Sequence, residues 1–523
     1  MNRAAFLETI TAHREAWDIA VIGGGATGAG IAVDAASRGY RVVLLEQNDF
    51  GKGTSSRSTK LVHGGVRYLQ QGNIPLVMEA LRERGLLLQN APHLVRNLEF
   101  VVPNYLWWEA PFYGVGLKMY DLLAGQHGFG PSKILSRDEV LQHIPTLEPD
   151  GLRGGVIYHD GQFDDSRLLI NLIQTAVEQG ALVLNYARVT ALVKDARGKV
   201  TGLTFRDEES DREHALGARC LINATGPYCD QLRRLDNPDT TPMIAPSQGV
   251  HLVLPREFLA SHVAIMVPHT RDGRVLFAVP WHGHVLVGTT DTPISEISLE
   301  PRAQEGEVDF ILETAGRYMA KCPTRADILS VFTGIRPLVK TKSEANTAAL
   351  SRDHTIQVSP SGLLTIAGGK WTTYRKMAED AVSRAAELAS LPERPCVTRE
   401  LRVHGFPSPP EMPGPLADYG ADAGKIADLI GEQPGLATPL HESMPICGAQ
   451  IVWAARYEMA RTLDDVLARR TRALFLNARA ALAMAPAAAR LLADTLGCDD
   501  DWQRRQLADF TEIAAGFLPV WQP

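Results

Sequence analysis

Two short apolar runs flank a helical pattern near the start of the chain. The runs lie in DIAVIG at residues 18–23 and RVVLLE at residues 41–46, and residues 26–38 between them carry the helical pattern. Short apolar runs of this kind are typical of buried strands. Gly39 ends the helix, because glycine is favoured just beyond a helix terminus. The pattern therefore predicts a strand–helix–strand unit over residues 18–46.

A glycine-rich turn joins the first strand to the helix. It holds Gly23, Gly25 and Gly28 in the spacing GxGxxG. The first glycine of such a unit permits the tight turn, the second lets backbone approach a pyrophosphate, and the third allows close helix–strand packing. The helix N-terminus offers N–H groups to the phosphates, and Glu46 is spaced to accept a hydrogen bond from a ribose 2′-OH. A carboxylate there repels a 2′-phosphate, so the unit predicts a dinucleotide other than NADP.

The rest of the chain divides into a strand-rich part and a helical tail. Residues 75–90 predict a helix, residues 181–207 three strands, and residues 218–230 a buried strand. Alternating patterns over 250–290 predict a mostly antiparallel sheet, and residues 362–389 a strand, a Gly-Gly turn and a long helix. Seven prolines between residues 392 and 415 indicate a linker. We therefore expect an interleaved domain over 1–390, a linker over 391–415 and an all-helical domain over 416–523.

Composition narrows the class of protein. The 523 residues are 45% hydrophobic and 22% charged, which is ordinary for a globular protein of two or three domains. A net charge of −7 gives no general attraction to nucleic acid or anionic lipid. Six scattered cysteines form no CxxC pair, so we expect neither a zinc site nor a disulfide framework. The charged N-terminus is unlike a secretory signal and no long apolar window suits a transmembrane helix, which favours a cytoplasmic protein.

Two segments leave their environment open. Residues 105–123 hold Trp107, Trp108, Phe112, Tyr113, Met119 and Tyr120. Such aromatics suit a membrane surface, although packing in a core or against another domain is the preferred interpretation. In the tail, Arg469, Arg470 and Arg472 form a basic cluster. We expect it to be a solvated helix face paired with Asp464 and Asp465 rather than an anion site.

Three later turns indicate that the nucleotide is FAD rather than NAD. LINATG at 221–226 and LVGTTD at 286–291 are strands ending in small or polar residues, and Gly368-Gly369-Lys370 opens a helix. FAD is long, so its contacts must come from separated parts of the chain. A helix N-terminus with a lysine can face the electron-rich edge of a flavin and stabilise its reduced, anionic form.

The order of the motifs resembles one family. GTSSRSTKLVHGGVRYL at 53–69, INATGPYCD at 222–230, VGTTDT at 287–292, FTGIRPL at 332–338 and IAGGKWTTYRKMAE at 366–379 are similar to FAD-dependent glycerol-3-phosphate dehydrogenases of the bacterial aerobic type. The resemblance covers residues 15–390, and the tail resembles that family's helical domain. It implies an α/β fold with a glutathione-reductase-like, Rossmann-type FAD-binding domain, an antiparallel-sheet substrate domain and a C-terminal all-helical domain. It also implies oxidation of sn-glycerol 3-phosphate to dihydroxyacetone phosphate by hydride transfer to FAD, with electrons passed to membrane quinone.

A phosphorylated substrate sets the chemistry expected of the site. Its phosphate requires clustered Arg or Lys side chains. By resemblance, the substrate-binding positions are Arg67, Tyr68, His251, Arg336, Arg352 and Lys370. Among these, we expect His251 to be the base that takes the alcohol proton, with Arg336 and Lys370 as the other catalytic residues. His63 is a rival base that we expect to be structural or in contact with flavin.

The expected FAD-binding positions come from the glycine unit, the hydroxyl-rich loop after it and the later turns. They are Gly23, Gly25, Ala26, Thr27, Gly28, Glu46, Gln47, Thr54, Ser55, Ser56, Ser58, Lys60, Leu61, His63, Gly64, Gly65, Val189, Ala224, Thr225, Gly226, Asp291, Gly334, Gly369, Lys370, Trp371, Thr372 and Thr373. No cysteine or histidine lies in a flavin-linking context, so we expect non-covalent FAD and no metal.

Three alternatives remain at this point. A flavin amine oxidase acting on sarcosine, glycine or a D-amino acid needs one carboxylate clamp rather than several cations. A glycerol-3-phosphate oxidase would pass its electrons to O₂. A flavoprotein whose tail binds a macromolecule is the third, and the net acidity gives nucleic acid no support. Because quinone is lipid-soluble, we expect peripheral attachment at the cytoplasmic face of the inner membrane, and a homodimer is compatible with the sequence.

Overall fold

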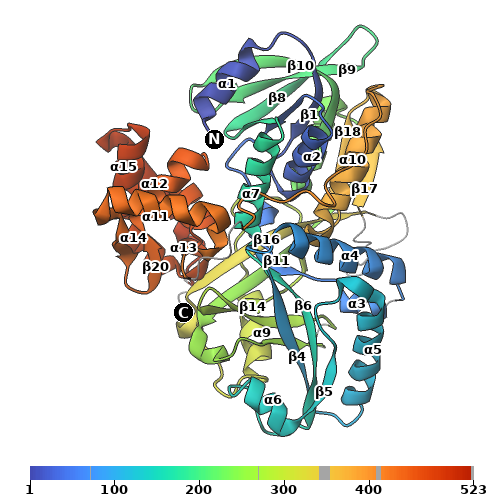
Figure 1. The fold of residues 1–523 in the computed structure, drawn as a ribbon, viewed down its shortest axis with the longest axis vertical. Coiled ribbons are helices and arrows are strands. Elements are labelled where there is room, and N and C mark those ends of the chain that lie inside the picture. Colours follow the sequence, from blue (N-terminus) through green and yellow to red (C-terminus); the bar gives the residue numbers. More distant parts are fainter. Residues whose placement is uncertain (71, 269, 272, 341–353, 408–413, 520–523) are drawn as a thin grey trace.

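The protein consists of two large sheets with a helical domain beside them (Figure 1). The computed structural model describes the chain except residues 71, 269, 272, 341–353, 408–413 and 520–523, and of Arg67 and Gln70 it describes the backbone alone. None of the described helices has the length and apolar composition needed to span a membrane.

The first sheet carries the predicted strand–helix–strand unit. Its parallel core has the order β18 (Leu364–Gly368), β10 (Arg212–Asn223), β1 (Trp17–Ile22), β2 (Val42–Leu45) and β7 (Leu182–Leu184). β17 (His354–Val358) adds an antiparallel edge. β8 (Ala187–Lys194), β9 (Val200–Asp207) and the start of β10 form an antiparallel ribbon. The strands expected within residues 181–207 and 218–230 are therefore confirmed.

Both faces of this parallel core are covered. α2 (Ala26–Ser37), α7 (Asp165–Glu178) and α10 (Tyr374–Leu388) bury one face together with Ile19 and Val21 of β1. Ala20 and Ile22 point to the other face and pack with α1 (Arg3–Ala12) and the ribbon. A strand buried on both faces has no polar side, which explains the uninterrupted apolar run at residues 19–22.

The second sheet has ten strands and lies below the first in Figure 1. The strands are β3 (Leu61–Val62), β4 (Val95–Asn104), β5 (Lys133–Ser136), β6 (Gly154–Phe163), β11 (Ile244–Pro255), β12 (Ala264–Val267), β13 (Leu276–Trp281), β14 (His284–Gly288), β15 (Thr292–Pro293) and β16 (Ser330–Val339). In the described part of the chain all its pairings are antiparallel except that of β4 with β12. The mostly antiparallel sheet expected from the alternating patterns is confirmed.

Helices edge the second sheet. α3 (Val66–Gln70), α4 (Ile74–Asn90) and α5 (Glu109–Ala124) lie together on the side away from the helical domain (Figure 1). α6 (Arg137–His143) packs against β5 and β6, and α9 (Glu305–Gly316) against β11 and β14. The helix predicted over residues 75–90 is confirmed as α4.

The C-terminal domain is helical, as expected, and also contains a hairpin. Its helices are α11 (Ala423–Glu432), α12 (Gly448–Tyr457), α13 (Ala473–Leu476), α14 (Ala478–Leu496) and α15 (Asp500–Ala515). β19 (Pro439–His441) pairs with β20 (Met444–Cys447), in a stretch where two prolines exclude a helix. Val466 and Phe475 share one apolar core with Phe332 of β16, so the domain is packed onto the second sheet.

The basic cluster of the tail is buried, so the expected solvated helix face is wrong. Arg469, Arg470 and Arg472 are each at most 3% exposed, around a π-helical turn at Asp465–Arg470. Arg469 does pair with Asp464 and Asp465, as expected. The environment differs from the prediction because this segment lies against the loop that follows β2.

Candidate functional site

A crevice opens at the carboxyl ends of neighbouring parallel strands of the first sheet. Its cavity, of about 480 Å³, is lined by the turns after β1, β2, β10 and β18, represented by Gly23, Glu46, Ala224 and Gly369. In open α/β sheets this edge is where nucleotides bind. The glycine unit and the turns at 221–226 and 368–370, which the sequence predicted for the nucleotide, therefore meet in one place, whereas the predicted turn at 286–291 does not line this cavity.

The glycine turn has the geometry expected of it. Gly23 has φ +109°, and a Cβ there would lie 2.7 Å from the Ala224 carbonyl oxygen of the next strand. A Cβ on Gly28 would lie 1.8 Å from the Gly23 carbonyl oxygen, which no side chain tolerates. The turn and the start of α2 can therefore be this close only with glycine at both positions. The N-cap residue of α2 is Gly25, which has no side chain to cover the helix N-terminus, and Gly25, Ala26 and Thr27 line the cavity.

Glu46 closes the turn and lines the cavity. One carboxylate oxygen accepts the Gly24 N–H at 2.6 Å, and the other accepts the Asn48 N–H at 2.9 Å. Burial raises the pKa of this carboxyl, which the two N–H donors and the charge of Arg469 oppose. Each oxygen keeps a second lone pair, so Glu46 can hold the turn and accept a ribose hydroxyl together.

A loop of small hydroxyl residues forms the middle of the crevice. Ser55 Oγ accepts the Ala26 N–H of α2 at 2.9 Å, and the Ser55 carbonyl accepts the Trp371 indole N–H at 2.9 Å. Thr54 Oγ donates to the Ile335 carbonyl of β16 at 2.6 Å. This loop therefore connects the glycine turn with the Gly-Gly turn before α10 and with the second sheet.

A second cavity of about 210 Å³ continues from the first. The two share Thr54, Pro337 and the stretch 368–371 as walls. Its floor lies between β11 and β16, where Gly249 is paired with Gly334. A Cβ on Gly249 would lie 2.4 Å from the Arg336 guanidinium, and one on Gly334 would lie 2.8 Å from the Arg57 carbonyl oxygen. The paired glycines therefore let the Arg336 guanidinium and the loop at Arg57 lie directly against the two strands.

His251 lies beside this hollow in a dry setting. Its ring stacks on Phe332 at 4.9 Å, and Nε2 lies 2.9 Å from Thr59 Oγ. The ring is 3% exposed, and Nδ1 has no hydrogen-bond partner in the described part of the chain. Burial, together with the nearby charges of Lys60 and Arg336, lowers the pKa of His251 well below its ordinary value. The imidazole is therefore neutral at pH 7.

Positive charge lines the same cavity. Arg336 donates to the Thr290 carbonyl at 2.9 Å and pairs with Asp291 at 3.3 Å, so its guanidinium is fixed at the cavity wall. The Lys370 ammonium lies 3.8 Å from the ring centroid of Tyr68. Two cations from different elements thus border the hollow that also holds His251. This arrangement can bind a small dianion next to a neutral proton acceptor.

Most of the expected positions gather at the two cavities. Those that line them are Gly23, Gly25, Ala26, Thr27, Glu46, Gln47, Thr54, Ser55, Ser58, Leu61, His63, Val189, Ala224, Thr225, Gly226, His251, Gly334, Arg336, Gly369, Lys370, Trp371 and Thr372. Gly28, Ser56, Lys60, Gly64, Gly65, Tyr68, Asp291 and Thr373 line neither cavity. Arg352 lies outside the described residues, and the side chain of Arg67 is not described.

Lys60, which was expected to bind FAD, lines neither cavity. Its ammonium is fully buried and donates to Asp165 at 2.6 Å and to the Ser56 carbonyl at 2.8 Å. Burial lowers its pKa to about 7, although the attraction of Asp165 opposes the shift. The side chain thus supports the loop from behind, whereas the cofactor-binding role expected for it would place it on the cavity wall.

Several residues that line the cavities were not predicted from the sequence. Lys52, Arg57 and Thr59 fall within or beside the hydroxyl-rich motif, but nothing local indicates which of its side chains face inward. Tyr228 directly follows the INATGP turn. Gly249 could have been found, because a glycine inside a strand often marks a close approach to a ligand.

The residues present fit FAD. The helix N-terminus and glycine turn suit a pyrophosphate, Glu46 suits a ribose, and the first cavity runs directly into a second one with polar and cationic walls. Among the described residues, no three His, Cys, Asp or Glu side chains are grouped to hold a metal ion.

Comparison with known families and sequences gives a consistent result. Residues 18–375 match the family described as FAD dependent oxidoreductase, and residues 365–503 match the C-terminal domain of alpha-glycerophosphate oxidase. The mitochondrial glycerol-3-phosphate dehydrogenase of Rattus norvegicus is 40% identical over 99% of this chain and 75% of its own length. Mitochondrial glycerol-3-phosphate dehydrogenase SDP6 of Arabidopsis thaliana is also 40% identical, over 96% of this chain and 86% of its own length.

Solved structures agree with this. Glycerol-3-phosphate dehydrogenase from Bacillus halodurans, solved in complex with FAD, superposes with a TM-score of 0.80 at 29% identity, over 100% of this chain and 99% of that one. Glycine oxidase from Geobacillus kaustophilus gives a TM-score of 0.54 at 19% identity, over 75% of this chain and 99% of that one. The second likeness shows a shared fold alone.

Proposed function

We propose a reaction from one premise that these comparisons establish: this chain belongs to the FAD-dependent oxidoreductases and, among them, to the glycerol-3-phosphate dehydrogenases. On that premise it binds FAD and oxidises sn-glycerol 3-phosphate to dihydroxyacetone phosphate. The observation that carries the assignment is the second cavity, where His251, Arg336 and Lys370 border one hollow adjoining the nucleotide crevice.

Oxidation of a secondary alcohol removes a proton from oxygen and a hydride from carbon. Bound FAD supplies the acceptor for the hydride. His251 is neutral at pH 7 and can take the hydroxyl proton, either directly or through the Thr59 hydroxyl that lies 2.9 Å from Nε2.

The phosphate of the substrate would lie against Arg336 and Lys370. Arg336 keeps its orientation through Asp291 and the Thr290 carbonyl, so it does not have to be ordered when the substrate binds. An amine oxidase substrate such as sarcosine carries one carboxylate, which offers two neighbouring cations less negative charge than a phosphate dianion does. The cations therefore favour a phosphorylated alcohol over an amino acid.

We also propose that the electrons leave to a membrane quinone and that α5 docks on the lipid surface. Trp108, Phe112, Val115, Met119 and Leu122 recur every three or four residues along the helix and are all exposed, with Leu122 at 82%. The opposite face of α5 is already buried through Tyr113, Leu117 and Tyr120. A helix with an exposed apolar stripe and aromatic side chains suits the lipid–water interface, and the exposed Lys118 beside the stripe suits anionic headgroups.

Steady-state assays separate the competing activities. With an artificial dye as acceptor, glycerol 3-phosphate is expected to support turnover and sarcosine is not. With glycerol 3-phosphate fixed, a soluble quinone analogue is expected to support a much higher rate than air. Comparable rates with O₂ and release of peroxide would instead make the protein an oxidase, as the description of the family matched by residues 365–503 allows.

A further inference from the structure

The segment 464–472 of the helical domain makes a set of ion pairs with the loop that follows β2. The loop, residues 46–60, contributes walls to both cavities. The helical domain holds the loop through three charged residues, called anchors here: Asp49, Lys52 and Asp165. Each anchor fixes a different point along the loop. In the ion pairs that join these anchors to the helical domain, no charged side chain is more than 12% exposed.

The first anchor is Asp49, at the end of the loop near Glu46. Arg470 donates to both carboxylate oxygens of Asp49, at 2.7 and 2.8 Å, and Arg469 donates to the same group. Burial opposes ionisation of Asp49, yet the two guanidinium groups hold its pKa below the ordinary value. Asp49 is therefore charged and bidentately held, which is a geometrically specific contact. It fixes the turn whose neighbouring residues Glu46 and Gly51 line the nucleotide crevice.

The second anchor is Lys52, in the middle of the loop. Its ammonium lies 2.6 Å from Asp464 of the helical domain and 2.6 Å from Glu300. Glu300 also pairs with Arg57 at 2.6 Å. Lys52 borders the first cavity and Arg57 the second, so this anchor connects both.

The third anchor is Asp165, the first residue of α7, which holds the end of the loop near His251. Arg472 donates to Asp165 at 3.1 Å and to the Ser56 carbonyl at 2.9 Å. The other oxygen of Asp165 accepts the Ser58 N–H at 3.0 Å and the Lys60 ammonium at 2.6 Å. Thr59 lies between these two held residues, and its hydroxyl faces His251.

We propose that the helical domain clamps the cofactor loop, with Arg470 positioning the nucleotide end and Arg472 positioning the end that carries Thr59. The role of Arg470 depends only on FAD being bound, whereas the role of Arg472 rests on the proposed function. Because the anchors lie at different points, their loss has different consequences. Loss of the Asp49 anchor weakens FAD binding, whereas loss of the Asp165 anchor disturbs proton removal with FAD still bound.

The test uses charge-preserving substitutions in the full chain. Lysine keeps the charge of Arg470 or Arg472 but cannot make a bidentate or two-point contact. Arg504→Lys is the matched control, because Arg504 belongs to the same domain and pairs with Asp501 at the surface. FAD affinity is measured without substrate from the fluorescence of released flavin, and the melting temperature of each FAD-free variant reports folding.

We expect Arg470→Lys to raise the Kd for FAD about tenfold, the effect of losing one charged hydrogen bond. Arg472→Lys should leave the Kd for FAD within about twofold, but it should slow flavin reduction by substrate and shift the pH dependence of that rate. Arg504→Lys should change neither the Kd for FAD nor the rate of flavin reduction. An unchanged Kd in Arg470→Lys, or equal losses in all three variants, overturns the clamp. If Arg470→Lys does not fold, Asp464→Asn replaces it, because Asp464 pairs with Lys52 and lines neither cavity. Weaker FAD binding is then expected, and an unchanged Kd counts against the proposal.

Failure of the two proposals can be told apart. If glycerol 3-phosphate does not reduce the flavin of the unsubstituted protein, the proposed function is wrong, and the Kd comparison still decides the Arg470 half of the clamp. If the flavin is reduced but Arg472→Lys keeps both the rate and the pH profile, the Arg472 half is wrong and the function stands.

Discussion

His251 is the residue on which the proposed proton removal depends most. It is buried against Phe332 with an unpartnered Nδ1, and its pKa lies well below the ordinary value because burial disfavours the cation. We expect His251→Ala to reduce the rate of flavin reduction about 10²-fold or more, the usual contribution of a positioned base. FAD content, measured by absorbance of the purified protein, should stay the same because His251 lines the second cavity and not the nucleotide crevice.

Thr59→Val tests the hydroxyl that contacts His251 and is compared with His251→Ala. It keeps the shape of the side chain and removes the hydroxyl that lies 2.9 Å from Nε2. A rate between those of the unsubstituted protein and His251→Ala is expected if this hydroxyl orients the ring. An unchanged rate of flavin reduction in His251→Ala would remove the histidine from the mechanism.

The element of most interest is α5, because it is apolar on two faces. Its inner face packs in the protein, whereas Val115 at 69% and Leu122 at 82% exposed lie on the outer side, and Trp107, which is 78% exposed, lies two residues before the helix. We expect replacement of Trp107, Val115 and Leu122 by serine to abolish cosedimentation with vesicles of mixed neutral and anionic lipid. Dye-linked turnover of glycerol 3-phosphate should be unaffected, because none of the three residues borders either cavity.

Val193→Ser with Leu388→Ser is the control for this element, since both are exposed apolar residues, on β8 and α10, and line neither cavity. The control should cosediment like the unsubstituted protein. If instead the α5 variant keeps its vesicle binding and loses a dimer in analytical ultracentrifugation, the stripe is an interface between copies of this chain.

Elements were predicted well wherever the information is local. The apolar run of β1, the glycine turn and the helix over residues 75–90 each depend on a few neighbouring residues, and each is found as expected. The outer face of α5 could not be assigned, because apolar periodicity identifies a helix but not what covers it. The burial of Arg470 depends on Asp49, 421 residues away, so a local charge pattern indicated a solvated face.

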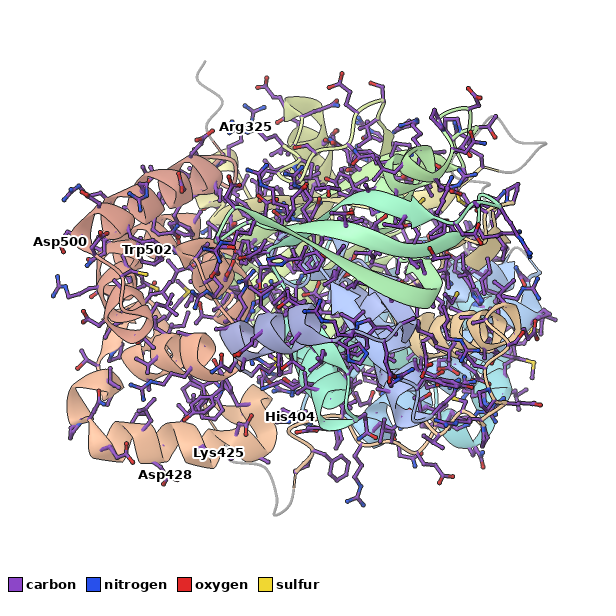
Figure 2. All side chains as sticks on the ribbon, turned by 90° about the horizontal axis from the view of Figure 1, so that it is seen from above. Arg325, His404, Lys425, Asp428, Asp500 and Trp502 are labelled. Carbon is purple, nitrogen blue, oxygen red and sulfur yellow. The ribbon has the colours of Figure 1, made fainter. Side chains whose placement is uncertain are left out.

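At the scale of the whole molecule, His404 joins the helical domain to the rest. It lies in the stretch between the domains and pairs with Asp422 at 2.7 Å and with Glu178 of α7. Figure 2 shows His404 below α7 with Lys425 on the neighbouring α11, and Lys425 pairs with the same Asp422. Burial opposes protonation, but the hydrogen bonds to Asp422 and Glu178 raise the pKa of His404 to about 9.

This pKa predicts how stability depends on pH. Because the folded-state pKa lies above that of an unfolded histidine, the stabilising contribution is complete below about pH 6.5 and is lost as the pH rises through about 9. We expect His404→Gln to lose on the order of 2 kcal/mol of unfolding free energy at pH 6.5 and little at pH 9.5. Denaturant unfolding at both values checks this, and a loss independent of pH would contradict the ion-pair account.

The central claim is that the two adjoining cavities hold FAD next to glycerol 3-phosphate. Its most direct test is an anaerobic titration of the FAD-loaded protein with sn-glycerol 3-phosphate, followed through the flavin absorption band near ~450 nm. The account predicts bleaching by glycerol 3-phosphate and none by sarcosine. A flavin that stays oxidised with glycerol 3-phosphate but is bleached by sarcosine would contradict it.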